Sequence, residues 1–102
     1  MTSPHVPPRC TRLRYSRHAL ERMFQRGISP DVLEAALDSG EVIATYADDQ
    51  PYPSVLLLGW HKAQPIHAVV AQDPVTGLCQ VVTVYRPQAN LWDTTFKVRK
   101  ST

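Results

Sequence analysis

Cysteine is scarce in this chain of 102 residues, which contains only Cys10 and Cys79. The two lie far apart in sequence, and neither belongs to a Cys-x-x-Cys pair. Small domains held by several disulfides, and cysteine-bound zinc sites, need more cysteines at closer spacing. We therefore expect two free thiols in a reducing compartment.

Long apolar runs are also missing. The longest, Val55 to Leu58, is far shorter than the roughly 20 apolar residues that a membrane-spanning helix needs. The N-terminal ten residues contain no apolar stretch of the kind found in a signal peptide. The sequence thus predicts a protein that is neither exported nor inserted into a membrane, and a cytoplasmic location.

Several catalytic motifs are absent. The chain has no glycine-rich phosphate loop, no Gly-x-Ser-x-Gly turn and no dinucleotide-binding fingerprint. The four histidines, at positions 5, 18, 61 and 67, are widely separated, and no His-x-x-x-His pair occurs. These absences argue against nucleotide-cofactor and acyl-transfer enzymes, and we expect no metal and no cofactor.

Charge is small in total but unevenly distributed. The net charge is +2. Residues 1–26 contain six arginines against Glu21 alone, residues 31–73 contain seven acidic residues against Lys62 alone, and the tail from Arg86 onwards is basic again. If the two ends meet in space, they form one basic face suited to RNA. The alternative is an ordinary solvated surface with scattered arginines.

Size and apolar pattern predict one α+β domain over residues 15–102, preceded by a flexible basic leader at 1–14 that contains three prolines. Ser16 and Ser29 are suitable N-caps, and Gly27 and Gly40 suitable helix ends, so helices are expected between them. Their apolar residues should be buried, namely Leu20, Met23, Phe24, Val32, Leu33, Ala36 and Leu37.

Four strands should follow the helices. The runs 42–46, 55–60, 66–72 and 79–85 are short and rich in β-branched and aromatic residues, and their connections are short. The predicted fold is two N-terminal helices packed on a four-stranded, mainly antiparallel sheet. Leu91, Trp92 and Phe96 in the polar tail are expected to fold back over an edge or the open face of that sheet.

One flank of the first helix is basic, because His18, Arg22 and Arg26 recur every four residues. Such stacked cations favour an anion, so this flank is a candidate phosphate site, unless Glu21 and nearby acidic loops neutralise it. In the first helical turn the helix dipole favours neutral His18, which could then act as a base. A solvated surface histidine is the alternative.

The strands offer three further candidates. His67 lies within a strand, where a histidine is more often structural than catalytic. Thr83 and Tyr85 alternate with Val82 and Val84, which would place a hydroxyl and a phenol on one face of the last strand. The same alternation is typical of a half-exposed strand without catalytic function.

The order of these motifs resembles the bacterial family catalogued as domain of unknown function 4258. The resemblance covers residues 15 to 99 and rests on Tyr15-Ser16-Arg17-His18-Ala19, Arg22, Arg26-Gly27-Ile28-Ser29, Pro51-Tyr52-Pro53-Ser54, Leu56-Leu57-Leu58-Gly59, Pro65-Ile66-His67-Ala68-Val69-Val70, Val82-Thr83-Val84-Tyr85-Arg86-Pro87, Trp92, Phe96 and Arg99. That family is grouped with the barnase, colicin and RelE-like ribonuclease fold. The resemblance thus implies an RNA-cleaving toxin whose partner is a small antitoxin protein.

Metal-free RNA cleavage needs a base for the 2′-hydroxyl proton, cations for the charged intermediate and an acid for the leaving oxygen. The expected catalytic residues are His18, His67 and Tyr85. The expected phosphate- or RNA-binding residues are Arg22, Arg26, Thr83 and Arg99. The rival hypotheses are a non-catalytic module that binds RNA or an acidic protein through the same basic face, and a structural protein in which His67 belongs to the core.

Overall fold

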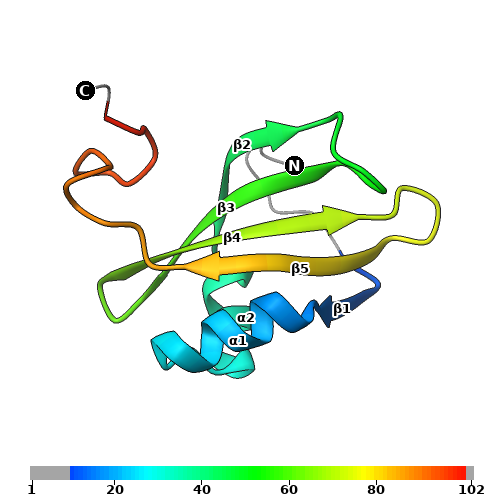
Figure 1. Cartoon of the computed structure of the whole chain (residues 1–102), viewed down its shortest axis with the longest axis horizontal. Coiled ribbons are helices and arrows are strands. Elements are labelled where there is room, and N and C mark those ends of the chain that lie inside the picture. Colours follow the sequence, from blue (N-terminus) through cyan, green and yellow to red (C-terminus); the bar gives the residue numbers. More distant parts are fainter. Residues whose placement is uncertain (1–9, 101–102) are drawn as a thin grey trace.

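A five-stranded sheet forms one layer of the molecule and two helices cover one of its faces (Figure 1). This computed structural model describes residues 10–100, so most of the predicted leader, up to Arg9, lies outside the described residues. The elements in chain order are β1 (Arg12–Tyr15), α1 (Arg17–Arg26), α2 (Pro30–Asp38), β2 (Glu41–Tyr46), β3 (Ser54–His61), β4 (Gln64–Gln72) and β5 (Leu78–Tyr85).

The sheet differs from the predicted one. Its strand order is β1-β5-β4-β3-β2, in which β2 to β5 form the expected antiparallel meander and β1 adds a parallel edge strand beside β5. The prediction of a four-stranded sheet is therefore wrong, and residues 12–14, assigned to the leader, form most of β1. A four-residue strand carries little pattern of its own, and its partner, at Leu78–Val81, lies more than 60 residues away in sequence.

Both predicted helices are confirmed, with Ser16 and Ser29 as N-caps and Gly27 at the end of α1, whereas the C-cap of α2 is Ser39 and not the predicted Gly40. The Ser16 side chain accepts a hydrogen bond from the Ala19 amide at 2.9 Å, and Gly27 ends α1 with a left-handed φ of 67°. The Ser29 side chain accepts from the Val32 amide at 3.2 Å, and Pro30 is the first residue of α2. Local sequence signals were sufficient here because a cap is made by neighbouring residues.

The buried side of α1 is narrower than predicted. Ala19 and Met23 are buried, whereas Leu20 is 47 % exposed and Phe24 is 89 % exposed. The prediction that Leu20 and Phe24 are core residues is wrong. They lie about 100° around the helix from Ala19 and Met23, and α1 packs against β5, near the edge of the sheet, so only one narrow stripe of the helix is covered.

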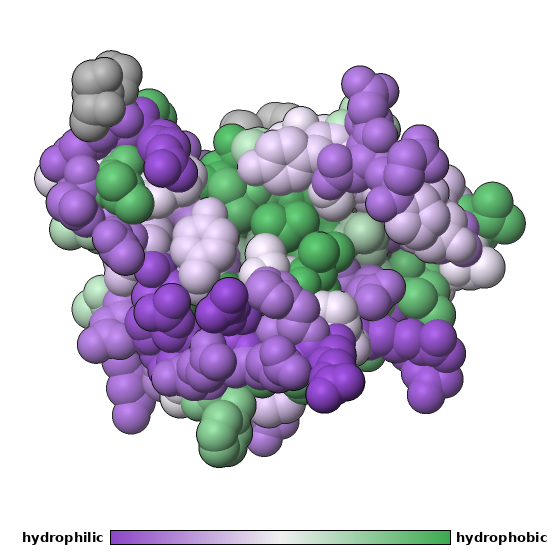
Figure 2. Space-filling view, in the orientation of Figure 1, coloured by the Kyte–Doolittle hydropathy of each residue, from purple (hydrophilic) through white to green (hydrophobic). Residues whose placement is uncertain are grey.

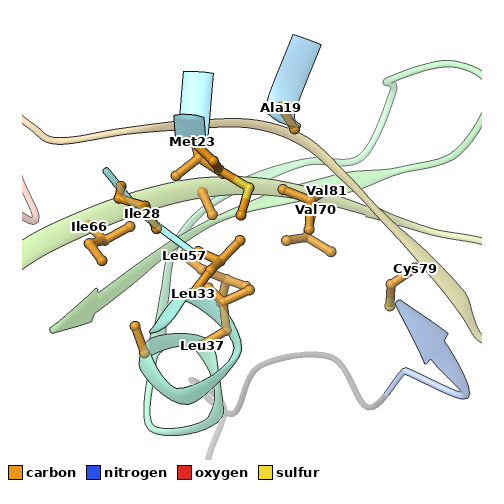
Figure 3. Close-up of a cluster of buried hydrophobic side chains, with 13 residues drawn as sticks. Ala19, Met23, Ile28, Leu33, Leu37, Leu57, Ile66, Val70, Cys79 and Val81 are labelled. Atoms are coloured by element: carbon orange, nitrogen blue, oxygen red, sulfur yellow. The ribbon is translucent and has the colours of Figure 1, made fainter. Parts of the chain in front are cut away.

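The core lies between the helices and the sheet (Figure 3). It contains side chains from both helices, from the segment between them and from the helix-facing side of β3 to β5: Ala19, Met23, Ile28, Leu33, Ala36, Leu37, Leu57, Ile66, Ala68, Val70, Cys79, Val81 and Val84. The residues that alternate with them on the strands point to the other, open face of the sheet.

The C-terminal tail covers one end of that open face. The Trp92 ring meets the His67 ring edge-on, with ring centroids 4.5 Å apart, and the Phe96 ring meets the Trp60 ring edge-on, with centroids 6.0 Å apart. Lys97 adds an ion pair with Glu41 at 3.1 Å. The tail therefore folds back onto the open face as predicted (Figure 1).

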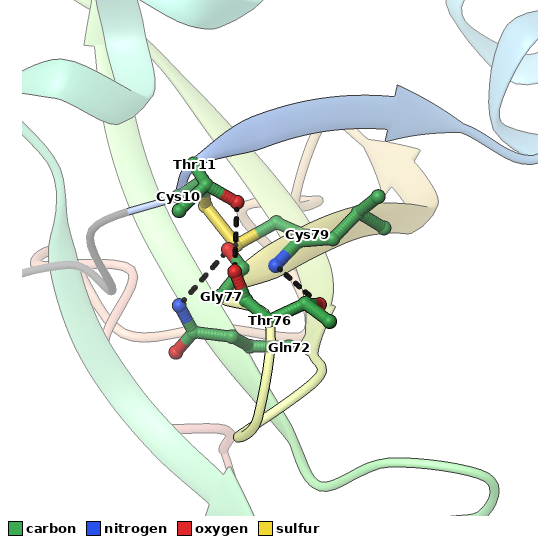
Figure 4. Close-up of a disulfide and its surroundings, with 7 residues drawn as sticks. Cys10, Thr11, Gln72, Thr76, Gly77 and Cys79 are labelled. Atoms are coloured by element: carbon green, nitrogen blue, oxygen red, sulfur yellow. Dashed lines mark hydrogen bonds between the residues drawn. A yellow bond between two sulfur atoms is a disulfide. The ribbon is translucent and has the colours of Figure 1, made fainter.

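The two cysteines are joined. Cys10 and Cys79 form a disulfide between the residue before β1 and the second residue of β5, with Cα atoms 5.4 Å apart. Thr11, beside Cys10, also donates a hydrogen bond from its hydroxyl to the Thr76 carbonyl at 3.1 Å (Figure 4). The prediction of two free thiols is wrong, because the fold brings together residues that lie 69 positions apart. Neither helix within residues 10–100 is long and apolar enough to cross a membrane.

Candidate functional site

A bulge in β5 sets the direction of its polar side chains. Val69 of β4 pairs with Thr83, but the next residue, Val70, pairs with Val81, so Val82 is an extra residue in β5. Val81 and Val84 can therefore both be buried on the helix side. Thr83 and Tyr85 share the open face, as predicted.

His18 meets Thr83 at the edge of the sheet. Strand β1 covers β5 only as far as Val81, and α1 lies beside the remainder. In the first turn of α1, the His18 side chain reaches the open edge, where its Nε2 lies 3.0 Å from the Thr83 hydroxyl oxygen. The other ring nitrogen, Nδ1, has no hydrogen-bond partner among residues 10–100. His18 is thus an exposed, oriented imidazole with one nitrogen open to a ligand.

Two arginines follow His18 on the same flank of α1. Arg22 and Arg26 are exposed, as predicted, and neither belongs to an ion pair within the described part of the chain. Glu21, which could have neutralised them, pairs instead with Arg17 at 3.2 Å. Arg22 donates a hydrogen bond to the Gln25 side chain at 3.1 Å. The flank therefore presents two cations whose charges have no acidic partner.

His67 is fully buried, with 0 % of its surface exposed, in the middle of β4. Its Nε2 lies 2.8 Å from the Phe96 carbonyl oxygen, which can only accept, so Nε2 carries the proton. Its Nδ1 then accepts from the Tyr85 hydroxyl at 3.1 Å. Burial lowers the pKa of His67, which favours this neutral form, although the hydrogen bond to Phe96 opposes the shift. With both nitrogens bonded, His67 positions Tyr85 and the tail.

Tyr85 is half-buried between His67 and the open face. Burial raises the pKa of its phenol, the Tyr46 phenol adds to this rise, and the Arg99 guanidinium opposes it. The phenol therefore stays protonated at neutral pH and could serve as an acid.

The structure brings the predicted residues together around β5. His18 contacts Thr83, His67 contacts Tyr85, and Arg99 pairs with Trp92, whose ring meets His67. His67 alone is closed to a substrate.

The surface of this face has two parts (Figure 2). Apolar and weakly polar surface lies over the middle of the sheet, and a band of hydrophilic surface runs below it over α1. The apolar part of such a surface can hold bases, and the exposed arginines of α1 can contact phosphates. Within residues 10–100 no group of three or more histidine, cysteine or acidic side chains could hold a metal ion.

Comparison with known proteins finds one family. Residues 15–86 match a family described as Domain of unknown function (DUF4258). No curated protein and no solved structure matches the chain. The expected grouping with the barnase, colicin and RelE-like ribonucleases is therefore without support from known structures.

Proposed function

We propose that this chain, which belongs to the family described as Domain of unknown function (DUF4258), cuts single-stranded RNA without a metal ion at the edge of β5. The observation that carries the proposal is the pair formed by His18 and Thr83. An exposed imidazole, held by a neighbouring hydroxyl and flanked by unpaired arginines, is suited to take a proton beside a phosphate.

The proposed reaction begins at His18. When Nε2 donates to Thr83, Nδ1 is the basic nitrogen, and it accepts the proton of the RNA 2′-hydroxyl. The 2′-oxygen attacks the adjacent phosphorus, the bond to the 5′-oxygen breaks, and a 2′,3′-cyclic phosphate forms. Arg22 or Arg26 stabilises the added negative charge on the phosphate oxygens.

Tyr85 supplies the proton for the leaving 5′-oxygen. Tyr85 lies two residues beyond Thr83 on the same face of β5. When substrate is bound, the Tyr85 hydroxyl turns from His67 Nδ1 to the leaving oxygen. His67 is a positioning residue in this scheme, because it is buried and holds the phenol. Arg99 binds a neighbouring phosphate from the tail side.

The test is cleavage of a fluorophore-labelled single-stranded RNA by purified protein in EDTA. We expect His18→Ala to lower the rate by about a hundredfold or more. The matched control is His61→Ala, which changes a histidine at the end of β3, a strand separated from β5 by β4, and should leave the rate unchanged. Thr83→Val removes only the hydroxyl that holds His18, and it should lower the rate to a smaller extent.

Two results would overturn the proposal. If wild-type protein binds RNA but leaves it intact, the non-catalytic module takes its place. If His18→Ala cuts as fast as wild type, the reaction centre lies elsewhere.

A protein-binding module is the second candidate, and one observation favours it. Leu20 and Phe24 lie one turn apart on the exposed side of α1 and form an apolar ridge. A protein partner, such as the antitoxin that the resemblance implies, could cover this ridge without blocking His18, which lies on the opposite flank of the helix.

The disulfide bears on where the protein acts. Disulfides persist mainly in oxidising compartments. The bond between Cys10 and Cys79 is therefore evidence against the cytoplasmic location that free thiols had favoured.

A further inference from the structure

Arg86, the residue after β5, contains the one buried side-chain nitrogen or oxygen atom without a hydrogen-bond partner among residues 10–100. The atom is Nη1 of its guanidinium group. Arginine remains charged at any physiological pH, and removing one of its N–H groups from water without an acceptor is costly. Buried polar groups in folded proteins nearly always have partners. An unpartnered guanidinium nitrogen can therefore take a hydrogen-bond acceptor from outside the described residues, such as an anion.

No acidic side chain among residues 10–100 forms an ion pair with Arg86. The two ion pairs within the described residues join Arg17 to Glu21 and Lys97 to Glu41. Arg99 lies at this end of the sheet as well, since it pairs with Trp92, whose ring meets His67. An acceptor from outside residues 10–100 would satisfy the Arg86 nitrogen, and an arginine favours an oxyanion that takes two parallel hydrogen bonds, such as a phosphate.

The position of Arg86 fits the edge at which His18 meets Thr83. Arg86 directly follows β5, and α1 packs against that strand. The flank of Arg22 and Arg26 continues along α1 from His18, beside β5. Arg86 follows Thr83 by three positions, which is about 10 Å along an extended chain. This distance spans one or two nucleotides of an RNA strand.

We propose that Arg86 binds a phosphate group at the edge between β5 and α1. That this phosphate belongs to RNA rests on the proposed function, whereas the anion site itself does not. Arg86 was absent from the residues expected from sequence, because Tyr-Arg-Pro at a strand end is typical of an exposed arginine.

The first test compares thermal unfolding in inorganic phosphate and in chloride at equal ionic strength. Wild-type protein should be stabilised by several degrees at about a tenfold excess of phosphate over its Kd. Arg86→Met should abolish this response. The control, Arg17→Met, removes an arginine whose side chain is 94 % exposed and should leave the response intact.

Two features separate a binding residue from a structural one. Arg86→Met should be at least as stable as wild type without phosphate, since it removes an unpaired buried group. Arg86→Lys keeps the charge but loses the two parallel hydrogen bonds, and it should lose most of the phosphate response. Equal stabilisation of wild type and Arg86→Met by phosphate, or strong destabilisation by both substitutions with no phosphate response in wild type, would overturn the proposal.

The second test uses a 2′-O-methyl RNA oligonucleotide, which cannot be cleaved, and measures its binding by fluorescence anisotropy. Arg86→Met should weaken binding by about tenfold. Unchanged oligonucleotide affinity alongside a lost phosphate response would overturn the assignment to RNA in favour of free phosphate. If wild-type protein binds phosphate through Arg86 but does not cut RNA, the proposed catalysis fails and the anion site stands.

Discussion

The Nε2 atom of His67 donates a hydrogen bond to the Phe96 carbonyl at 2.8 Å and so joins the middle of the sheet to the C-terminal tail. The Trp92 ring lies against the same imidazole. His67 thus acts as the anchor of the tail, and its protonation state affects the stability of the folded protein.

Acid should weaken this anchor. Burial lowers the pKa of folded His67 below its usual value near 6.5. Well above pH 6.5 the imidazole is neutral in both the folded and the unfolded state, and its contribution to the free energy of unfolding is fully present. As the pH falls below 6.5, the unfolded chain binds a proton that the folded one resists, and stability is lost by up to about 1.4 kcal/mol at pH 5.5.

The measurement is chemical unfolding at pH 7.5 and 5.5, with an NMR titration of the His67 ring. His67→Gln should be less stable at pH 7.5 and should show a smaller further loss at pH 5.5, whereas His61→Gln should behave as wild type. A His67 titration midpoint at or above 6.5 would contradict the prediction.

Adjacent residues of α1 should differ sharply in their effect on stability. Met23 is buried and Phe24 is 89 % exposed. Met23→Ala should reduce the free energy of unfolding by about 2–5 kcal/mol, and Phe24→Ala should change it by less than about 0.5 kcal/mol. Denaturant unfolding of the two variants tests which side of α1 faces the sheet, and the reverse order of effects would show that the helix is turned the other way.

Two glycines should resist alanine for different reasons. A Cβ atom at Gly59 would lie 2.5 Å from the Ala36 carbonyl oxygen, where α2 crosses β3. Because the clash is with backbone atoms, which cannot move aside easily, Gly59→Ala should lower the free energy of unfolding by about 1–3 kcal/mol or more. Gly27 has open space around it but a φ of +67°, so Gly27→Ala should cost about 1 kcal/mol through backbone strain alone. Thermal melts compare the two, and a neutral Gly59→Ala would show that the helix and strand are less close.

Reduction of the disulfide should destabilise the fold without unpairing the meander of β2 to β5. The bond closes a loop between residues 69 positions apart, for which chain entropy predicts about 4 kcal/mol, although measured values are often smaller. Unfolding with and without dithiothreitol measures the difference. The double variant Cys10→Ser, Cys79→Ser is the control and should not respond to the reductant; an equal response would mean that the bond is not its target.

Sequence by itself was enough for the features that neighbouring residues determine. Ser16, Gly27, Ser29 and Pro30 bound the helices because caps act over one turn. The four strands of the meander are recognisable because their partners follow directly in the chain. Helical periodicity alone predicts the basic flank of α1, and strand periodicity alone predicts that Thr83 and Tyr85 share one face.

Only the tertiary structure decided the contacts between distant segments. Strand β1 and the disulfide both require residues near position 12 to meet residues near position 79, which no local pattern encodes. The exposure of Phe24 depends on how much of α1 the sheet covers, and the burial of His67 depends on a tail 29 residues away. Burial and pairing are properties of the assembled layers, because a side chain loses water only when another segment displaces it.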